Sequence, residues 1–334
     1  MVSCRTAMKL ALTPWILGTL GVVGACSGGN GDATIGGGPP DHADGGLGAD
    51  GSPGADAGPR ADAAALANDG GDSGSTVTPE ASVPIDPSLR GQISIFDDTT
   101  YGGGQPEFVT GQLSASFSQI VVPGTPCVPA PTTVGPCTVG VVCSTGGQQN
   151  AAGAGAITLT GPLTPPTTLT DPGSHPYAEV DRPHISLFGD GETLQISATG
   201  GTVPAFSASL VAPTIATVVS PAMPDIESSN LLVLSGAADL TLAWTHGGAG
   251  QVGVLLAGGT GSTSTWASCA FTASAGSGTV PQAVIQTMAS PGMLYVGVSN
   301  DTVVDSGGWG ITINAGTWAT LPDGHVALTR VSVQ

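Results

Sequence analysis

The chain has 334 residues, of which 53 are glycine and 27 are proline, while only 9% are charged and 4% are aromatic. This composition excludes a coiled coil, a helical bundle and a membrane protein with several helical spans. The formal net charge of −18 excludes a basic nucleic-acid-binding protein, because phosphate groups would repel the chain.

Residues 1–25 are predicted to be an export signal. Arg5 and Lys9 form a short cationic segment, and an interrupted apolar run over residues 10–23 follows. The run is too short and too broken to span a bilayer, which takes about 20 apolar residues. It leads into a Val-Gly-Ala-Cys tetrapeptide that resembles the lipobox of bacterial lipoproteins. The resemblance implies that the signal is removed and that Cys26 carries a diacylglyceryl thioether.

Lipid on Cys26 would anchor the chain in a bilayer, stably when two or more acyl chains are attached. The next residue is Ser27 and not aspartate, which by analogy with Gram-negative sorting favours the outer membrane. We therefore expect a cell-envelope protein whose partners are the lipid bilayer and an extracellular or periplasmic protein or glycan.

Residues 26–87 are predicted to be a disordered acidic tether. Gly, Asp, Ala and Pro dominate this segment, and an Ala-Asp pair recurs every six residues between residues 43 and 62. Such a chain has too few apolar side chains to offset the entropy lost on ordering. A flexible coil of roughly 60 residues averages about 40–45 Å from end to end, enough to hold a folded domain away from a membrane.

From residue 88 onward, short alternations of apolar and polar residues are separated by Gly, Pro, Asn and Asp clusters, as in Leu113-Ser-Ala-Ser-Phe117. This pattern predicts half-buried strands, and the only plausible helix is a turn or two over residues 282–288. The predicted fold class is all-β, with one or two antiparallel β-sandwich domains.

A proline-rich seam near Pro221 divides the folded part into predicted domains at residues 88–222 and 223–334. In the second, the segment ending at Trp244 and the segment 251–256 resemble adjoining core strands of an immunoglobulin-like or fibronectin type III sandwich. The resemblance implies that Trp244 packs between two sheets. With its lipobox and tether, the chain is similar to bacterial surface lipoproteins of a kind that carries no assigned activity.

Four cysteines remain after the leader and Cys26, namely Cys127, Cys137, Cys143 and Cys269. In an exported protein they predict two disulfides. Cys137 and Cys143 would lie about 20 Å apart along one strand, so they are the least favoured pair. One of these two is expected to join Cys127 and the other Cys269. The spacing of the cysteines does not match paired zinc knuckles.

The densest polar segment of the folded part spans residues 171–192. His175, Glu179, Asp181 and His184 are its candidate metal ligands, and two of its carboxylates could act as a glycosidase acid–base pair. Prolines within the segment favour a solvated surface loop instead. A secreted-type hydrolase that uses this loop is therefore an alternative function, and an enzymatic role is not favoured.

Two other acidic clusters, Asp97-Asp98 and Asn300-Asp301 with Asp305, are predicted to sit at turns that follow apolar strands. Calcium is the alternative interpretation there, and the only cofactor that the sequence suggests.

A carbohydrate-binding module is a further alternative function, with Trp266 or Trp309 as the stacking residue. The favoured function is a lipid-anchored envelope protein that presents β-sandwich domains for binding or for a structural role.

Overall fold

The computed structural model describes residues 84–102, 105–125, 129–142, 147–161, 166–171, 173, 177–224, 226, 230–259 and 264–334. The predicted export signal at residues 1–25, the lipidation site Cys26 and nearly all of the predicted tether lie outside these residues. The described part is almost entirely β-structure, which confirms the predicted fold class.

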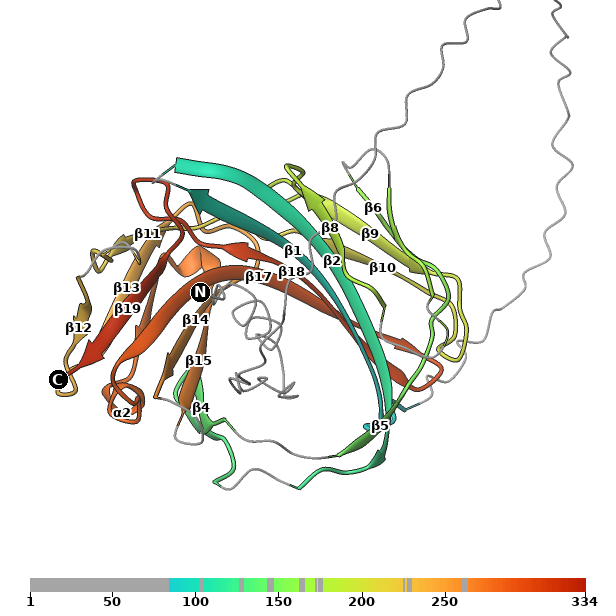
Figure 1. Ribbon diagram of the computed structural model, residues 1–334, viewed down its shortest axis with the longest axis horizontal. Helices are drawn as coiled ribbons and strands as arrows, with labels where there is room; N and C mark the ends of the chain where they lie inside the picture. Colours follow the sequence, from blue (N-terminus) through green and yellow to red (C-terminus); the bar gives the residue numbers. More distant parts are fainter. Residues whose placement is uncertain are drawn as a thin grey trace, which may run out of the picture. The chain divides into compact units, whose positions relative to one another are not determined.

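A 12-stranded main sheet organises the folded part, with the strand order β3-β4-β15-β14-β17-β18-β1-β2-β5 (Figure 1). Beside this path, β8 pairs with β2, β19 pairs with β17, and β12 pairs with β19. The strands are β1 (Leu89–Gly102), β2 (Gln105–Val122), β3 (Thr132–Val134), β4 (Cys137–Val141), β5 (Gln148–Ala151), β8 (Val180–Pro183), β12 (Leu232–Leu234), β14 (Gln251–Gly258), β15 (Thr265–Thr272), β17 (Gly292–Ser306), β18 (Trp309–Trp318) and β19 (Leu328–Val333). Its pairs are antiparallel except β1–β18 and β12–β19, which are parallel and depart from the predicted antiparallel pairing.

Two smaller sheets pack on the main sheet. One has the order β10-β9-β6-β7 and the other the order β11-β13-β16. Their strands are β6 (Ile157–Thr160), β7 (Thr167–Leu169), β9 (Thr193–Ala198), β10 (Phe206–Val211), β11 (Thr217–Ser220), β13 (Leu240–Thr245) and β16 (Ser277–Val280). A short helix α2 (Gln282–Ile285) lies where the sequence predicts one, and a 3-10 turn η2 (Ala273–Ala275) precedes β16.

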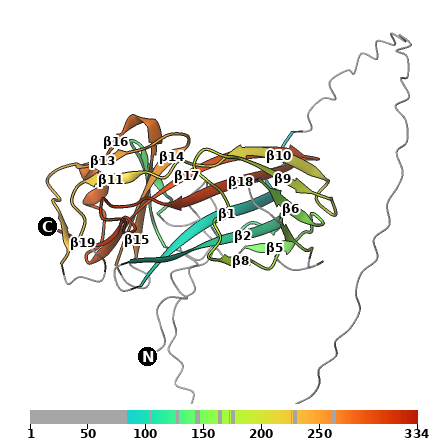
Figure 2. The same cartoon turned by 90° about the horizontal axis from the view of Figure 1, so that it is seen from above.

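Each smaller sheet encloses a separate hydrophobic core against the main sheet. The three-stranded sheet covers a first core that includes Leu242, Val252 and Leu294. The four-stranded sheet covers a second core that includes Ile93 and Leu194. Figure 2 shows the two groups of strands, with β17 passing between them.

Both cores lie on the same face of the main sheet. Along β17, Leu294 and Val296 belong to the first core, and Val304 packs against the second. Because side chains alternate between the faces of a strand, these even-numbered residues share one face. The opposite face of β17, β18, β1 and β2 is therefore covered by neither smaller sheet of the described residues.

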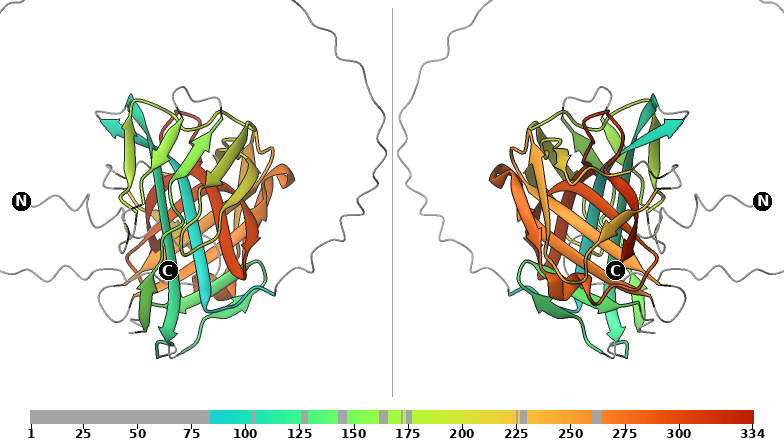
Figure 3. Two further views of the ribbon diagram at one scale, coloured as in Figure 1. Left: turned by 90° about the vertical axis from the view of Figure 1, so that its right-hand side faces the viewer. Right: turned by 90° about the vertical axis from the view of Figure 1, so that its left-hand side faces the viewer.

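The predicted boundary between residues 222 and 223 does not separate two sheets. β4 from the first half pairs with β15 from the second, and β1 pairs with β18. The described residues belong to one compact unit, so the predicted domains 88–222 and 223–334 share the main sheet. Figure 3 shows its long strands β1 and β2 side by side.

The folded part begins before residue 88. The backbone N–H of Asp86 donates to the carbonyl of Gly308 at the β17–β18 turn, at 2.8 Å. The Asp86 carboxylate accepts bonds from the backbone N–H and the hydroxyl of Ser88, which lower the pKa of Asp86. The predicted end of the tether at residue 87 is therefore a few residues late.

The prediction that two acidic clusters sit at turns is wrong. Asp97 and Asp98 lie within β1, and Asn300, Asp301 and Asp305 lie within β17. The strands continue beyond the apolar runs because their polar residues either face away from the cores or are hydrogen-bonded inside them.

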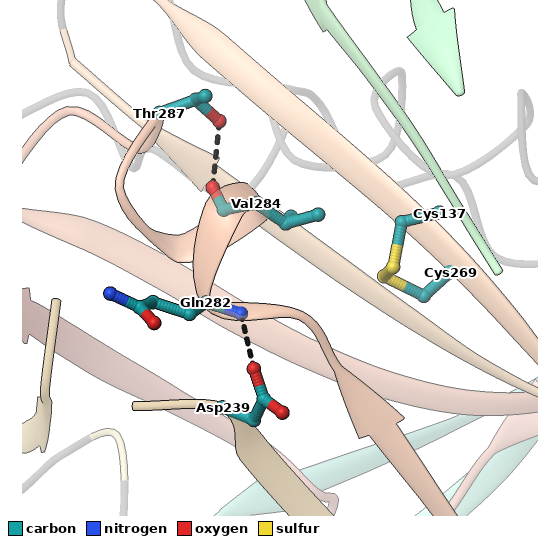
Figure 4. Close-up of a disulfide and its surroundings, with 6 residues drawn as sticks. All are labelled: Cys137, Asp239, Cys269, Gln282, Val284 and Thr287. Atoms are coloured by element: carbon teal, nitrogen blue, oxygen red, sulfur yellow. Dashed lines mark hydrogen bonds between the residues drawn. A yellow bond between two sulfur atoms is a disulfide. The ribbon is translucent and has the colours of Figure 1, made fainter. Parts of the chain in front are cut away.

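A disulfide joins Cys137 and Cys269, which are directly opposite each other on β4 and β15 with Cα atoms 4.0 Å apart (Figure 4). Both residues are buried in the first core. This pairing is one of those that the sequence left open. Cys127 and Cys143 lie outside the described residues, so their pairing stays a prediction.

Candidate functional site: the polar face of the main sheet

The face of β17, β18, β1 and β2 that points away from both cores carries rows of polar side chains. In one row, Asp301, Asn314, Ser94 and Ser114 lie directly opposite one another on successive strands. A second row lies two residues away along each strand. We call these two rows the polar face, which consists of Asp301, Asn314, Ser94, Ser114, Val303, Thr312, Gln92 and Ser116.

The alternation of the strands explains why these residues lie together. On β1, Ile93 and Ile95 point into the second core and are fully buried, so Gln92 and Ser94 point the other way. The members of the polar face are half-buried or exposed. In Figure 1, β6, β9 and β10 lie on the convex side of the bend of β1 and β2, so the polar face is on the concave side.

An aromatic cluster borders the polar face on the same side of the sheet. The indole N–H of Trp318 donates to the carboxylate of Asp98 at 2.9 Å. Phe96 meets the Trp318 ring edge-on at 5.6 Å, and Tyr295 stacks on it at 6.1 Å between ring centroids. Burial raises the pKa of Tyr295. This cluster is not predictable from the sequence, because no local pattern indicates that three strands bring these rings together.

The two tryptophans proposed for sugar stacking have different environments. Trp309 is only 4% exposed and lies in the second core, 6.5 Å from the ring of Phe117, so it cannot act as a surface platform. Trp266 is half-buried, and its ring lies over Gly140 of the neighbouring strand, where a Cβ atom would approach within 2.8 Å. The side chain of Trp266 faces away from the first core, since its neighbour Ala267 belongs to that core.

Trp244, predicted to be a core residue, is buried in the first core. Its indole N–H donates to the carbonyl of Ala273 at 2.6 Å. β13, which carries Trp244, belongs to the three-stranded sheet, whereas β14 at residues 251–258 belongs to the main sheet. The two segments therefore contribute to the first core from different sheets.

Much of the polar segment 171–192 binds backbone groups of the fold. The Asp171 carboxylate accepts N–H bonds from Gly155 at 3.0 Å and Gly173 at 2.7 Å. The buried Tyr177 hydroxyl accepts a bond from the N–H of Ala154 at 2.8 Å and donates to the carbonyl of Gly155 at 2.7 Å. Burial, more than the nearby Asp171 charge, raises the pKa of Tyr177. These side chains hold the loop that precedes β6.

The acids at the end of this segment have similar roles. The Glu192 carboxylate accepts a bond from the N–H of Gly189 at 2.7 Å. The Asp190 carboxylate accepts one from the N–H of Ile215 at 3.1 Å. Both carboxylates thus stabilise connections around the four-stranded sheet.

The candidate metal ligands of the segment lie partly outside the described residues. His175 lies outside the described residues, whereas Glu179, Asp181 and His184 are described and are exposed. In the part of the chain that the structure describes, no three His, Cys, Asp or Glu side chains are grouped as they would be around a metal ion.

Asp97 is the one strongly buried acid among the described residues. Its carboxyl group is bonded to the Ser186 hydroxyl and accepts the N–H of Leu187 at 2.8 Å. Its carbonyl accepts the hydroxyl of Thr317 at 2.8 Å. Burial raises the pKa of Asp97, although these hydrogen bonds to the carboxyl group act in the opposite direction.

Comparisons with protein-family models, curated proteins and solved structures gave no match for this chain. The function of the chain is therefore inferred from the residues described above. The described residues contain no helix with the length and apolar character needed to cross a membrane.

Proposed function

We propose that this chain is a lipid-anchored binding protein of the bacterial cell envelope, whose tether holds the folded unit away from the membrane. The lipobox supports the anchor at Cys26, and Ser27 supports the outer membrane as its location. Diacylation provides enough apolar surface for stable residence in a bilayer.

The observation that carries the binding role is the polar face. A sheet face is normally either packed against another layer or exposed to solvent. The polar face carries hydroxyl, amide and carboxylate groups in regular rows beside an aromatic cluster. Such a rigid array on strands is well suited to position groups for a ligand. By contrast, the described acids Asp171, Asp190 and Glu192 of the polar segment already bind backbone N–H groups.

The anchor is tested by fractionating cells that express the wild-type chain or Cys26→Ala, followed by mass spectrometry of the N-terminal peptide. We expect wild-type protein in the membrane fraction, with a lipid-modified Cys26 as its first residue. The Cys26→Ala variant should lack the lipid modification. An unmodified wild-type product in the soluble fraction, or one that still begins at Met1, would refute the proposal.

A further inference from the structure

We propose that the polar face binds an uncharged oligosaccharide, across the row formed by Asp301, Asn314, Ser94 and Ser114. This inference rests on the binding role proposed above and names the ligand class for the same face. It follows from the position of the strands, the chemistry of the side chains and the charge of the face.

The position of the strands excludes one common mode of binding. β18 is hydrogen-bonded to β17 and β1, and β1 is also hydrogen-bonded to β2, so their backbone groups are already paired. A peptide ligand that adds a strand needs a free sheet edge. A ligand on the polar face must therefore be recognised by side chains.

The side chains of this row match a ligand rich in hydroxyl groups. Serine hydroxyls and the amide of Asn314 each both donate and accept hydrogen bonds, and the carboxylate of Asp301 accepts them. A sugar hydroxyl also donates and accepts. Protein partners, in contrast, usually bury an apolar and aromatic centre, and the two rows contain Val303 as their only large apolar side chain.

The charge of the face selects among hydroxyl-rich ligands. Asp301 is its only charged member, and the whole chain carries a formal net charge of −18. Arg90, one row farther along β1, donates from its Nε to the carbonyl of Pro87 at 2.9 Å. Anionic polysaccharides and nucleic acids would be repelled, whereas an uncharged glycan would not.

The residues that border the row complete the match. The half-buried ring of Phe96 lies two residues from Ser94 on the same side of β1, next to Trp318, and offers an apolar surface for the C–H groups of a sugar ring.

The experiment measures binding of the full-length chain, solubilised in detergent, to a set of uncharged and anionic oligosaccharides. The uncharged set contains hexamers of glucose, mannose, xylose and N-acetylglucosamine, and the anionic set contains galacturonate and hyaluronate oligomers. Isothermal titration then compares wild type with Asn314→Ala and Ser94→Arg. The matched control is Gln195→Ala, which removes an exposed amide from β9 in the four-stranded sheet. Thermal unfolding checks that each variant is folded.

We expect at least one uncharged hexamer to bind, with its Kd raised about tenfold or more by Asn314→Ala and by Ser94→Arg and unchanged by Gln195→Ala. Two variants are used because Asn314 also donates to the carbonyl of Asn300 at 3.1 Å, and loss of that bond alone can affect the fold. Binding that both folded variants retain would overturn the site. Binding of anionic oligomers alone, or of no oligomer, would overturn the ligand class. Failure of the anchor would appear separately, in the fractionation experiment.

Discussion

The carboxyl group of Asp97 and the hydroxyl of Ser186, 89 residues apart in the sequence, are hydrogen-bonded where the loop after β8 meets β1. The same hydroxyl also lies 2.5 Å from the carbonyl of Phe188. The Ser186 hydroxyl thus links the carboxyl group of Asp97 on β1 to the backbone of the loop after β8.

Replacing Asp97 by asparagine should change how stability depends on pH. Burial raises the pKa of Asp97 in the folded state, so the unfolded chain releases its proton first as the pH rises. The free energy of unfolding then falls as the pH rises from the ordinary aspartate pKa to the raised one, and it stays at this lower value at higher pH. In Asp97→Asn the amide oxygen can still accept the N–H of Leu187 and there is no proton to lose, so the stability of the variant relative to wild type should increase across this window.

Urea unfolding between about pH 4 and pH 8 measures this difference directly. Asp97→Ala provides the contrast, because it leaves the buried N–H of Leu187 without its acceptor and should cost about 1–3 kcal/mol. A loss of stability at neutral pH that is as large for Asp97→Asn as for Asp97→Ala would contradict the prediction.

Tyr177→Phe should destabilise the folded unit by about 2 kcal/mol, because the N–H of Ala154 and the carbonyl of Gly155 both lose a buried partner. Chemical denaturation of the variant measures the loss. Thr168→Val serves as the control, since it removes an exposed hydroxyl that lies 3.3 Å from Thr158 and should change stability by less than about 0.5 kcal/mol. Equal stability of wild type and Tyr177→Phe would show that this hydroxyl does not hold the loop.

Removing the Cys137–Cys269 disulfide should lower the free energy of unfolding by about 2–5 kcal/mol. The two cysteines are 132 residues apart, so the bond restricts a long stretch of the unfolded chain. The double variant Cys137→Ala/Cys269→Ala tests this by urea unfolding. Both proteins are compared without reducing agent, and a variant as stable as the oxidised wild type would be inconsistent with a stabilising bond.

Trp309→Ala should unfold or severely destabilise the chain, at a cost of about 3–5 kcal/mol, because it leaves a large cavity in the second core. Trp266→Ala removes a half-buried ring and should cost less. Circular dichroism and thermal unfolding of the two variants separate these effects. A smaller loss for Trp309→Ala than for Trp266→Ala would contradict the burial of the two rings.

The strands of the core could be predicted from sequence because their signal is local. Ile93 and Ile95 alternate with Gln92 and Ser94, and burial of one face follows from that pattern. Trp244 was likewise correctly placed in a core, and the short helix after Pro281 was located.

The ends of the strands and the site could not be predicted in this way. Asp97 resembles a turn residue locally, and only the loop at Ser186 and Leu187, far away in the sequence, satisfies it inside β1. The row of Asn314 and Ser94 depends on the parallel pairing of β18 with β1. Such pairing between distant segments leaves no periodic signal in either of them.

The disulfide that the structure describes sharpens the prediction for the remaining cysteines. Because Cys137 is bonded to Cys269, the predicted scheme leaves Cys127 and Cys143, which flank the β3–β4 hairpin in the sequence. We expect peptic digestion at low pH without reduction, which suppresses thiol exchange, to yield a peptide pair joined through these two residues. Because this bond would close a much shorter loop, the variant Cys127→Ala/Cys143→Ala should lose less stability than Cys137→Ala/Cys269→Ala. Free thiols at Cys127 and Cys143 in the oxidised protein, found by alkylation and mass spectrometry, would refute the second disulfide.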